Sequence, residues 1–178
     1  MPSESEAETN ERRNCAYVEE QLGDNMEWFR RMGRGIDFDG KRVLEIGCGH
    51  GALSVFAAKH GSTQVIGLDV DESRIDFARR YTASQYPHLV GILQFETANA
   101  ASFHDGSFDM IISKDTCEDL EDVDETMEHC QRLLRSGGTL AIGFAPLYDS
   151  PYGDHGRFGL GIPWLHAMLP ESIPVRWI

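Results

Sequence analysis

The chain has 178 residues, a length that suits one domain, and its net charge of −13 comes from 29 acidic and 16 basic residues. This acidity disfavours a nucleic-acid partner, because the only basic clusters are three arginine pairs, each beside acidic or apolar residues. The four cysteines lack metal or disulfide spacing and no apolar run reaches 18 residues, so we expect a cytoplasmic protein without a membrane segment.

The amino-terminal part divides into two stretches. Residues 1–14 are polar and acid-rich without apolar periodicity, which predicts a disordered tail ahead of a single domain over residues 15–178. From Tyr17 to Met32, apolar residues recur at three- and four-residue steps and Gly33 follows, which predicts an amphipathic helix. This helix either covers a sheet or closes over a ligand.

Strands and helices then alternate along the chain. Short apolar runs predict strands at 42–46, 64–69, 91–96, 108–113 and 139–144. Helical patterns occupy 52–61, 71–85 and 122–138, the second with Asp71 as its amino-terminal cap and the third ending at Gly137. Nearly apolar strands separated by helices predict an α/β fold with a doubly wound, mostly parallel sheet and helices on both faces.

The loop after the first strand raises the question of a ligand. In "VLEIGCGHG", residues 43–51, Gly47, Gly49 and Gly51 alternate where a ligand must approach the backbone or φ must be positive. Asp69 ends the second strand 20 residues after Gly49, where its carboxylate can accept hydrogen bonds from ribose hydroxyls or cap the strand end. This spacing fits a dinucleotide as well as a nucleoside.

A family resemblance separates these readings. The stretches "VLEIGCGHG", "VIGLDV", "FHDGSFDMIIS" and "LLRSGGTLAIG" resemble, in this order, the motifs of class I S-adenosylmethionine-dependent methyltransferases of the small-molecule-modifying, type 11-like branch. Glu45 belongs to that signature. The resemblance covers about residues 41–144 and implies a Rossmann-like methyltransferase fold, S-adenosylmethionine as cofactor and methyl transfer to a small organic acceptor. The alternatives are an NAD-binding oxidoreductase and a catalytically idle, cofactor-binding interaction module.

The resemblance also implies a cofactor site. Separately, the sequence lacks metal-binding patterns such as H-E-x-x-H, so no metal site is expected. The glycines would pass beneath the methionine part, Asp69 would accept from the ribose, and Val70 would pack on the adenine. Thr97 stands where the family commonly has an acid that holds the adenine edge. The backbone amide of Ala98 would hold that edge here. The implied residues are Glu45, Gly47, Cys48, Gly49, Gly51, Asp69, Val70, Thr97, Ala98 and Ser113.

The catalytic side is less well defined by the sequence. A general base is needed only if the acceptor loses a proton, and histidine suits neutral pH best. The family's "LEH" is here "CED", residues 117–119, so a histidine found in some members is absent. His155, in a loop after the fifth strand, is the candidate base, with Tyr148 and Tyr152 as acceptor contacts.

The carboxyl-terminal part departs from the family. Only 34 residues follow Phe144, too few for the usual helix and antiparallel hairpin. We therefore expect the hairpin to be incomplete, residues 146–178 to fold back near the ligand crevice, and the exposed sheet edge to be covered by a second copy of the chain or by further residues.

Overall fold

The computed structural model describes residues 4–31, 36–116 and 122–143. The chain divides into two units, Met1–Ile142 and Gly143–Ile178, and all described residues except Gly143 belong to the first. His155, Tyr148, Tyr152 and the expected carboxyl-terminal fold-back lie outside the described residues, so they stay predictions, as does a single domain over 15–178.

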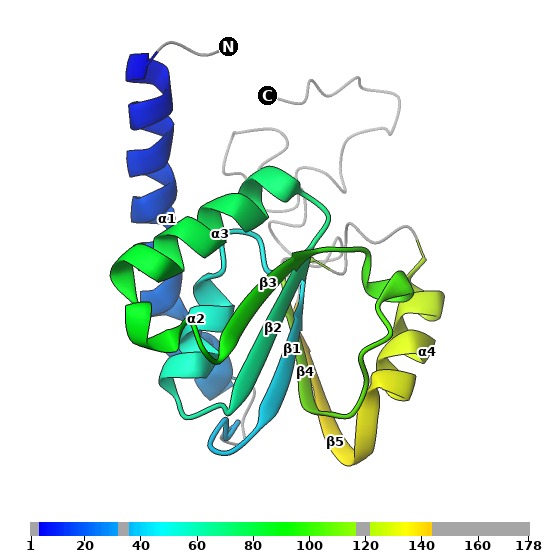
Figure 1. Ribbon diagram of the computed structural model, residues 1–178. Helices are drawn as coiled ribbons and strands as arrows, with labels where there is room; N and C mark the ends of the chain where they lie inside the picture. The colour runs from blue at the N-terminus through cyan, green and yellow to red at the C-terminus, as the bar shows by residue number, and fades with distance from the viewer. Residues whose placement is uncertain (1–3, 32–35, 117–121, 144–178) are drawn as a thin grey trace, which may run out of the picture. The chain divides into compact units, whose positions relative to one another are not determined.

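The first unit alternates strands with helices around one sheet (Figure 1). The strand order is β3-β2-β1-β4-β5, and β1 pairs in parallel with β2 and β4, as β2 does with β3. This confirms the predicted doubly wound fold, and the order reverses between β1 and β4. The elements are α1 (Glu4–Arg31), β1 (Arg42–Ile46), α2 (Ala52–Lys59), β2 (Gln64–Asp69), α3 (Glu72–Gln85), β3 (Leu93–Thr97), β4 (Phe108–Lys114), α4 (Val123–Leu133) and β5 (Leu134–Gly143), with short 3₁₀ helices at Pro87–Leu89 and Ala100–Ser102.

Both faces of the sheet are buried, because successive strand side chains point to opposite sides. Val43 and its neighbours pack with Phe29 of α1 and Phe56 of α2 on one face. Leu44 packs on the other face with Leu133 of α4 and the 3₁₀ helix at Ala100–Ser102. Figure 1 shows the same arrangement, with α1, α2 and α3 on one side and α4 on the other. The near-apolar strands therefore reflect burial on two faces.

The amino-terminal segment differs from its prediction. The disordered tail predicted for residues 1–14 is wrong from Glu4 onward, because α1 begins there and continues without a break to Arg31. Residues 8–12 are exposed, so they show no apolar periodicity. Polar residues still propagate a helix that is anchored further along, since propagation needs no new nucleus. Glu11 also pairs with Arg80 of α3 at 3.4 Å.

The junction between α4 and β5 also differs. The helical pattern predicted over 122–138 ends at Leu133, and β5 begins at the next residue. Arg135, expected in the last helical turn, instead pairs with Asp109 of β4 at 2.5 Å. Gly137 has φ +77 within β5 rather than capping a helix. Contacts with β4 thus override the local helical preference.

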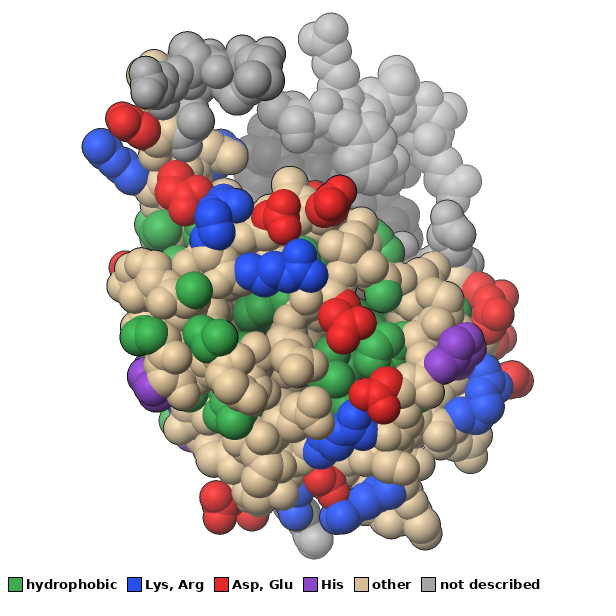
Figure 2. All heavy atoms as spheres, viewed as in Figure 1, with side chains coloured by type: hydrophobic (Ala, Val, Ile, Leu, Met, Phe, Trp, Pro, Cys, Tyr) green, Lys and Arg blue, Asp and Glu red, His purple; other side chains and the backbone are tan. Residues whose placement is uncertain are grey.

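The surface of the first unit carries charges of both signs. Acidic and basic side chains are interspersed over the face in view in Figure 2. Arg79 and Arg80, which form one of the three arginine pairs, face Asp76 and Glu11 respectively. Among the helices that the structure describes, none is long and apolar enough to cross a membrane.

Candidate functional site

The glycine loop leaves β1 with three residues in the left-handed region. Gly47, Gly49 and Gly51 have φ of +72°, +51° and +85°. A Cβ on Gly47 would lie 2.2 Å from the Thr116 side chain, and one on Gly51 would lie 2.7 Å from the Phe95 ring. A Cβ on Gly49 would meet nothing within 4 Å. Two of the glycines are therefore required by packing, and the third leaves bare backbone beside open space.

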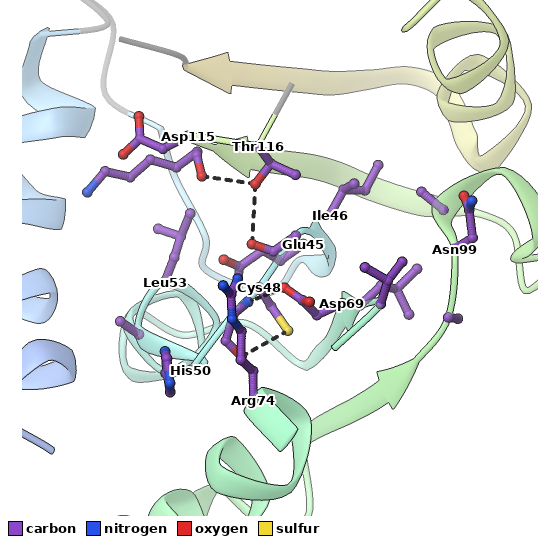
Figure 3. Close-up of a pocket in the computed structure, with 18 of the residues that line it drawn as sticks. Glu45, Ile46, Cys48, His50, Leu53, Asp69, Arg74, Asn99, Asp115 and Thr116 are labelled. Carbon is purple, nitrogen blue, oxygen red and sulfur yellow. Dashed lines mark hydrogen bonds between the residues drawn. The ribbon is translucent and has the colours of Figure 1, made fainter. Parts of the chain in front are cut away.

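Asp69 connects this loop to the end of β2. Its Oδ2 accepts a hydrogen bond from the Gly49 amide at 2.8 Å, and its Oδ1 accepts one from the Asp71 amide at 2.9 Å. The side chain points toward the loop in Figure 3, and the residue is only 8% exposed. Each carboxylate oxygen has a further lone pair, so Asp69 can hold the loop and still accept from a ligand.

Glu45 lies beneath the loop, next to the last residue of β1. It is buried and accepts a hydrogen bond from the Ser54 hydroxyl of α2. Burial raises the pKa of Glu45 to about 7, with a smaller increase from Asp69, while the Ser54 bond and Lys114 oppose the rise. The carboxyl group therefore changes charge near neutral pH, next to the ligand loop.

A cavity of about 820 Å³ opens at the carboxyl ends of the strands, around the switch point. A volume of this size is typical of small-molecule and cofactor sites. Seven of the ten cofactor residues expected from the sequence line this cavity. These are Glu45, Gly47, Cys48, Gly49, Asp69, Val70 and Ala98.

Gly51, Thr97 and Ser113 do not line the cavity. The space beside Gly51 is taken by Phe95, Thr97 pairs with Asp69 at the end of β3, and the Ser113 hydroxyl donates to the Ile46 carbonyl at 3.0 Å. The Ala98 amide, expected to hold an adenine edge, donates instead to the Asp69 carbonyl at 3.0 Å. Gly51, Thr97 and Ser113 therefore support the cavity through packing, strand pairing and a hydrogen bond, without lining it.

The sequence left open whether α1 closes over a ligand, and it named none of the α1 residues that line the cavity. Arg13, Tyr17, Gln21 and Asn25 all line the cavity. Their four-residue spacing places them on one face of the helix. A stripe of polar residues at helical spacing was the signal that could have identified them. Arg74, labelled in Figure 3, was missed as well.

His50 holds the glycine loop between α1 and α3. Its ring makes edge contacts with Tyr17 of α1 and Phe77 of α3, at centroid distances of 5.6 and 5.1 Å. Burial, followed by the positive charge of Arg74, lowers the pKa of His50. A neutral imidazole between two aromatic rings therefore positions the loop against both helices.

The end of β4 forms the remaining side. Asp115 has φ +54, a left-handed conformation that aspartate adopts more readily than most residues. Thr116 donates to the Gly47 carbonyl at 3.4 Å, as the dashed line in Figure 3 shows. Within the ranges that the structure describes, no group of three or more His, Cys, Asp or Glu is arranged to hold a metal ion.

The charges around the cavity suit a particular kind of ligand. The carboxyl groups of Glu45, Asp69 and Asp115 face it from three strand ends, with Lys114 and Arg74 as nearby cations. An acid at the end of β2 can accept from ribose hydroxyls, bare backbone at Gly49 allows close approach, and an acidic surround favours a positively charged group. Together, these carboxylates and the bare backbone fit a nucleoside that also carries a positive charge.

Comparisons with known proteins agree with this geometry. Residues 44–142 match the family model described as "Methyltransferase domain". The chain is 33% identical over 105 residues to the ubiquinone biosynthesis O-methyltransferase of Coxiella burnetii, covering 59% of this chain and 44% of that protein. It is 32% identical over 118 residues to the 27-O-demethylrifamycin SV methyltransferase of Amycolatopsis mediterranei, covering 64% and 42%.

A solved structure shows the same likeness. The S-adenosylmethionine-dependent methyltransferase from Mesorhizobium loti aligns with a TM-score of 0.56 and 26% identity, over 65% of this chain and 51% of that one. The chain thus spans less than half the length of the two curated relatives. Since the family model covers more than half of the chain, the protein belongs to the class I S-adenosylmethionine-dependent methyltransferases.

Proposed function

We propose that this protein binds S-adenosylmethionine in the cavity and transfers its methyl group to a small organic acceptor. The observation that carries the proposal is the connection between Asp69 and Gly49, which places an acceptor for ribose hydroxyls beside bare backbone. The curated relatives described above are named as methyltransferases of small molecules, which supports the acceptor class.

The described residues have distinct proposed roles in binding. Asp69 accepts from the ribose hydroxyls, Gly47 and Gly49 lie beneath the methionine part, and Val70, which is 73% exposed, packs on the adenine. Glu45 holds the loop through α2 and supplies negative charge near the cofactor's cationic groups. Cys48 and Ala98 complete the lining, whereas Gly51, Thr97 and Ser113 support it from behind.

The protein's share of the chemistry is alignment. When bound, the cofactor supplies an already activated methyl group on a positively charged sulfur. The chain then has to orient the acceptor and exclude water, and such positioning contributes roughly 7–11 kcal/mol to lowering a barrier. The wall from α1, with Tyr17 and Gln21 facing the cavity, is suited to both tasks.

His155 remains the proposed general base for an acceptor that must lose a proton. Its support is its place in the sequence, 12 residues after the end of β5, and the lack of a histidine in "CED". Replacing His155 by Ala should leave cofactor affinity unchanged and lower turnover by about 10²–10⁴-fold. Unchanged turnover would remove this role.

Calorimetry tests the cofactor directly. We expect S-adenosylmethionine and S-adenosylhomocysteine to bind, and NAD not to bind. Binding of NAD alone would favour the oxidoreductase reading. A screen of phenols, carboxylic acids and amines with labelled cofactor then tests turnover, and binding without turnover of any acceptor would favour an idle, cofactor-binding interaction module.

Three further features stay part of the proposal. A cytoplasmic location is supported by the spacing of the four cysteines in the sequence, which fits neither a disulfide scaffold nor a metal site. The net charge of −13 argues against nucleic-acid binding. A homodimer that covers a sheet edge is tested by the mass of the protein in solution, since a monomer at micromolar concentration would contradict it.

A further inference from the structure

A partly buried polar junction connects α1 to the end of β4. The Lys114 ammonium donates to Gln21 Oε1 at 2.9 Å and to Asn25 Oδ1 at 3.3 Å. An ammonium group can only donate, so both amides must present their oxygens to it. This requirement fixes the orientation of the Asn25 amide without reference to any other contact, because a flipped amide would place donor against donor.

The same constraint leaves a donor without a partner. Asn25 is 1% exposed, and its Nδ2 has no hydrogen-bond partner among the residues that the structure describes. Buried amide nitrogens are normally paired, and an unpaired one in a native structure calls for an explanation. Asn25 and Lys114 both line the cavity, and a molecule bound there is a candidate partner for this buried nitrogen after a small movement of the Asn25 side chain.

The chemistry of that partner follows from the groups present. The Asn25 NH₂ and the ammonium proton of Lys114 that is left after its two described bonds are donors only. Two donors, one of them charged, match the two oxygens of a carboxylate. A multiply charged anion fits less well, because Glu45 and Asp115 also line the cavity and would repel it.

We propose that Asn25 and Lys114 form a carboxylate-binding subsite at the junction of α1 and β4, with Gln21 holding the lysine in place. This inference rests on the proposed function. The carboxylate belongs either to the methionyl end of the cofactor or to the acceptor. In either case α1 recognises the ligand directly, rather than serving only to cover the sheet.

Two variants separate recognition from simple tethering of α1. Lys114→Met removes the charge and keeps the length of the side chain. Asn25→Asp keeps an oxygen facing Lys114, so the tether persists, but it replaces the unpaired donor with a negatively charged acceptor. Lys59→Met, on the far end of α2 and outside the cavity, is the matched control for loss of one positive charge. Circular dichroism and thermal unfolding establish that each variant is folded.

Calorimetry with two nucleosides locates the carboxylate. S-adenosylhomocysteine carries the amino-acid end, and 5′-methylthioadenosine lacks it. If the cofactor supplies the carboxylate, Lys114→Met and Asn25→Asp should weaken S-adenosylhomocysteine binding by about 10- to 100-fold and change 5′-methylthioadenosine binding less than about twofold. Lys59→Met should change neither. Loss of a merely structural tether would weaken both nucleosides alike and would overturn the proposal.

A second experiment tests whether the acceptor supplies the carboxylate. Benzoate and neutral benzamide are titrated into the parent protein and both variants, with and without S-adenosylhomocysteine. Selective binding of benzoate that both variants abolish, with nucleoside affinities unchanged, would assign the subsite to the acceptor. Unchanged binding of every probe in both variants would overturn the subsite. Failure of the parent to bind either nucleoside would instead contradict the proposed function, and the benzoate titration would still decide the subsite.

Discussion

The two walls of the cavity are built in different ways. The wall at β1 and β2 is held by backbone groups: the Asp69 carboxylate accepts from two amides, and Gly47 and Gly51 allow no added Cβ. The junction of α1 with β4 on the other wall is made by side chains, with the Lys114 ammonium donating to two amide oxygens. The first wall therefore depends on backbone geometry, whereas the junction at the second depends on the identity of three side chains.

The largest expected effect would break the backbone-built wall. Gly51→Ala forces a side chain into the left-handed region and places its Cβ 2.7 Å from the Phe95 ring and 3.1 Å from Ala78. We expect the free energy of unfolding to fall by roughly 2–5 kcal/mol, the sum of backbone strain and overpacking. Urea unfolding followed by circular dichroism measures this loss.

Gly49→Ala is the matched control for that variant. Its Cβ meets nothing within 4 Å, so only the backbone term of roughly 1–2 kcal/mol should appear. Cofactor affinity should nevertheless fall, because the added methyl occupies the bare backbone beside the cavity. Equal destabilisation by the two substitutions would contradict the division between packing glycines and a ligand-facing glycine.

Glu45, beneath the wall at β1 and β2, makes the stability of the protein depend on pH. Burial raises its pKa from 4.5 to about 7 in the folded state. Between these values the folded protein holds a proton that the unfolded chain releases, so the contribution of Glu45 to stability is complete below pH 4.5 and is lost as pH rises through 7. Glu45→Gln keeps an acceptor for Ser54 and does not titrate.

We therefore expect the stability of Glu45→Gln relative to the parent to increase with pH across this window, by on the order of a few kcal/mol, and to level off above it. Urea titrations from pH 4.5 to 8 measure the difference. A constant difference would show that the folded-state pKa of Glu45 is not raised. In the parent, cofactor binding near pH 7 should release protons, since a cation beside Glu45 lowers its pKa.

Asp69→Asn tests the connection between the loop and β2. An amide can replace only one of the two carboxylate oxygens, so either the Gly49 or the Asp71 amide loses its acceptor. Stability and cofactor affinity should each fall by about 1–3 kcal/mol. Asp71→Asn, which retains an oxygen for capping α3, is the control and should leave affinity unchanged. Parent-like affinity in Asp69→Asn would contradict the proposed ribose contact.

The smallest expected effect concerns the exposed half of α1. The pair between Glu11 and Arg80 joins side chains that are 50% and 61% exposed. Glu11→Gln should lower stability by less than about 1 kcal/mol, and the effect should shrink as salt is added. Thermal unfolding at two salt concentrations checks this. A larger, salt-independent loss would mean that this contact anchors α1.

The sequence predicted the backbone-built wall because its signals are local. Gly49 and Asp69 stand at the ends of two adjacent strands, and parallel neighbours bring their carboxyl ends together. Cys48 and Val70 follow from the same register. No comparable rule predicts the α1 wall from the sequence. Gln21 and Lys114 are 93 residues apart and meet only because α1 packs across the sheet.

Strand positions, the parallel sheet and the ligand loop were thus determined by apolar runs and glycine spacing, which act through local backbone preference and burial. Tertiary structure decided where local preference was weak or overruled: polar residues 4–14 joined α1, residues 134–138 joined β5, and the Ala98 amide turned to Asp69. It also brought the unpaired Asn25 amide beside Lys114, because a side chain gains a partner only when the folded chain places one within reach.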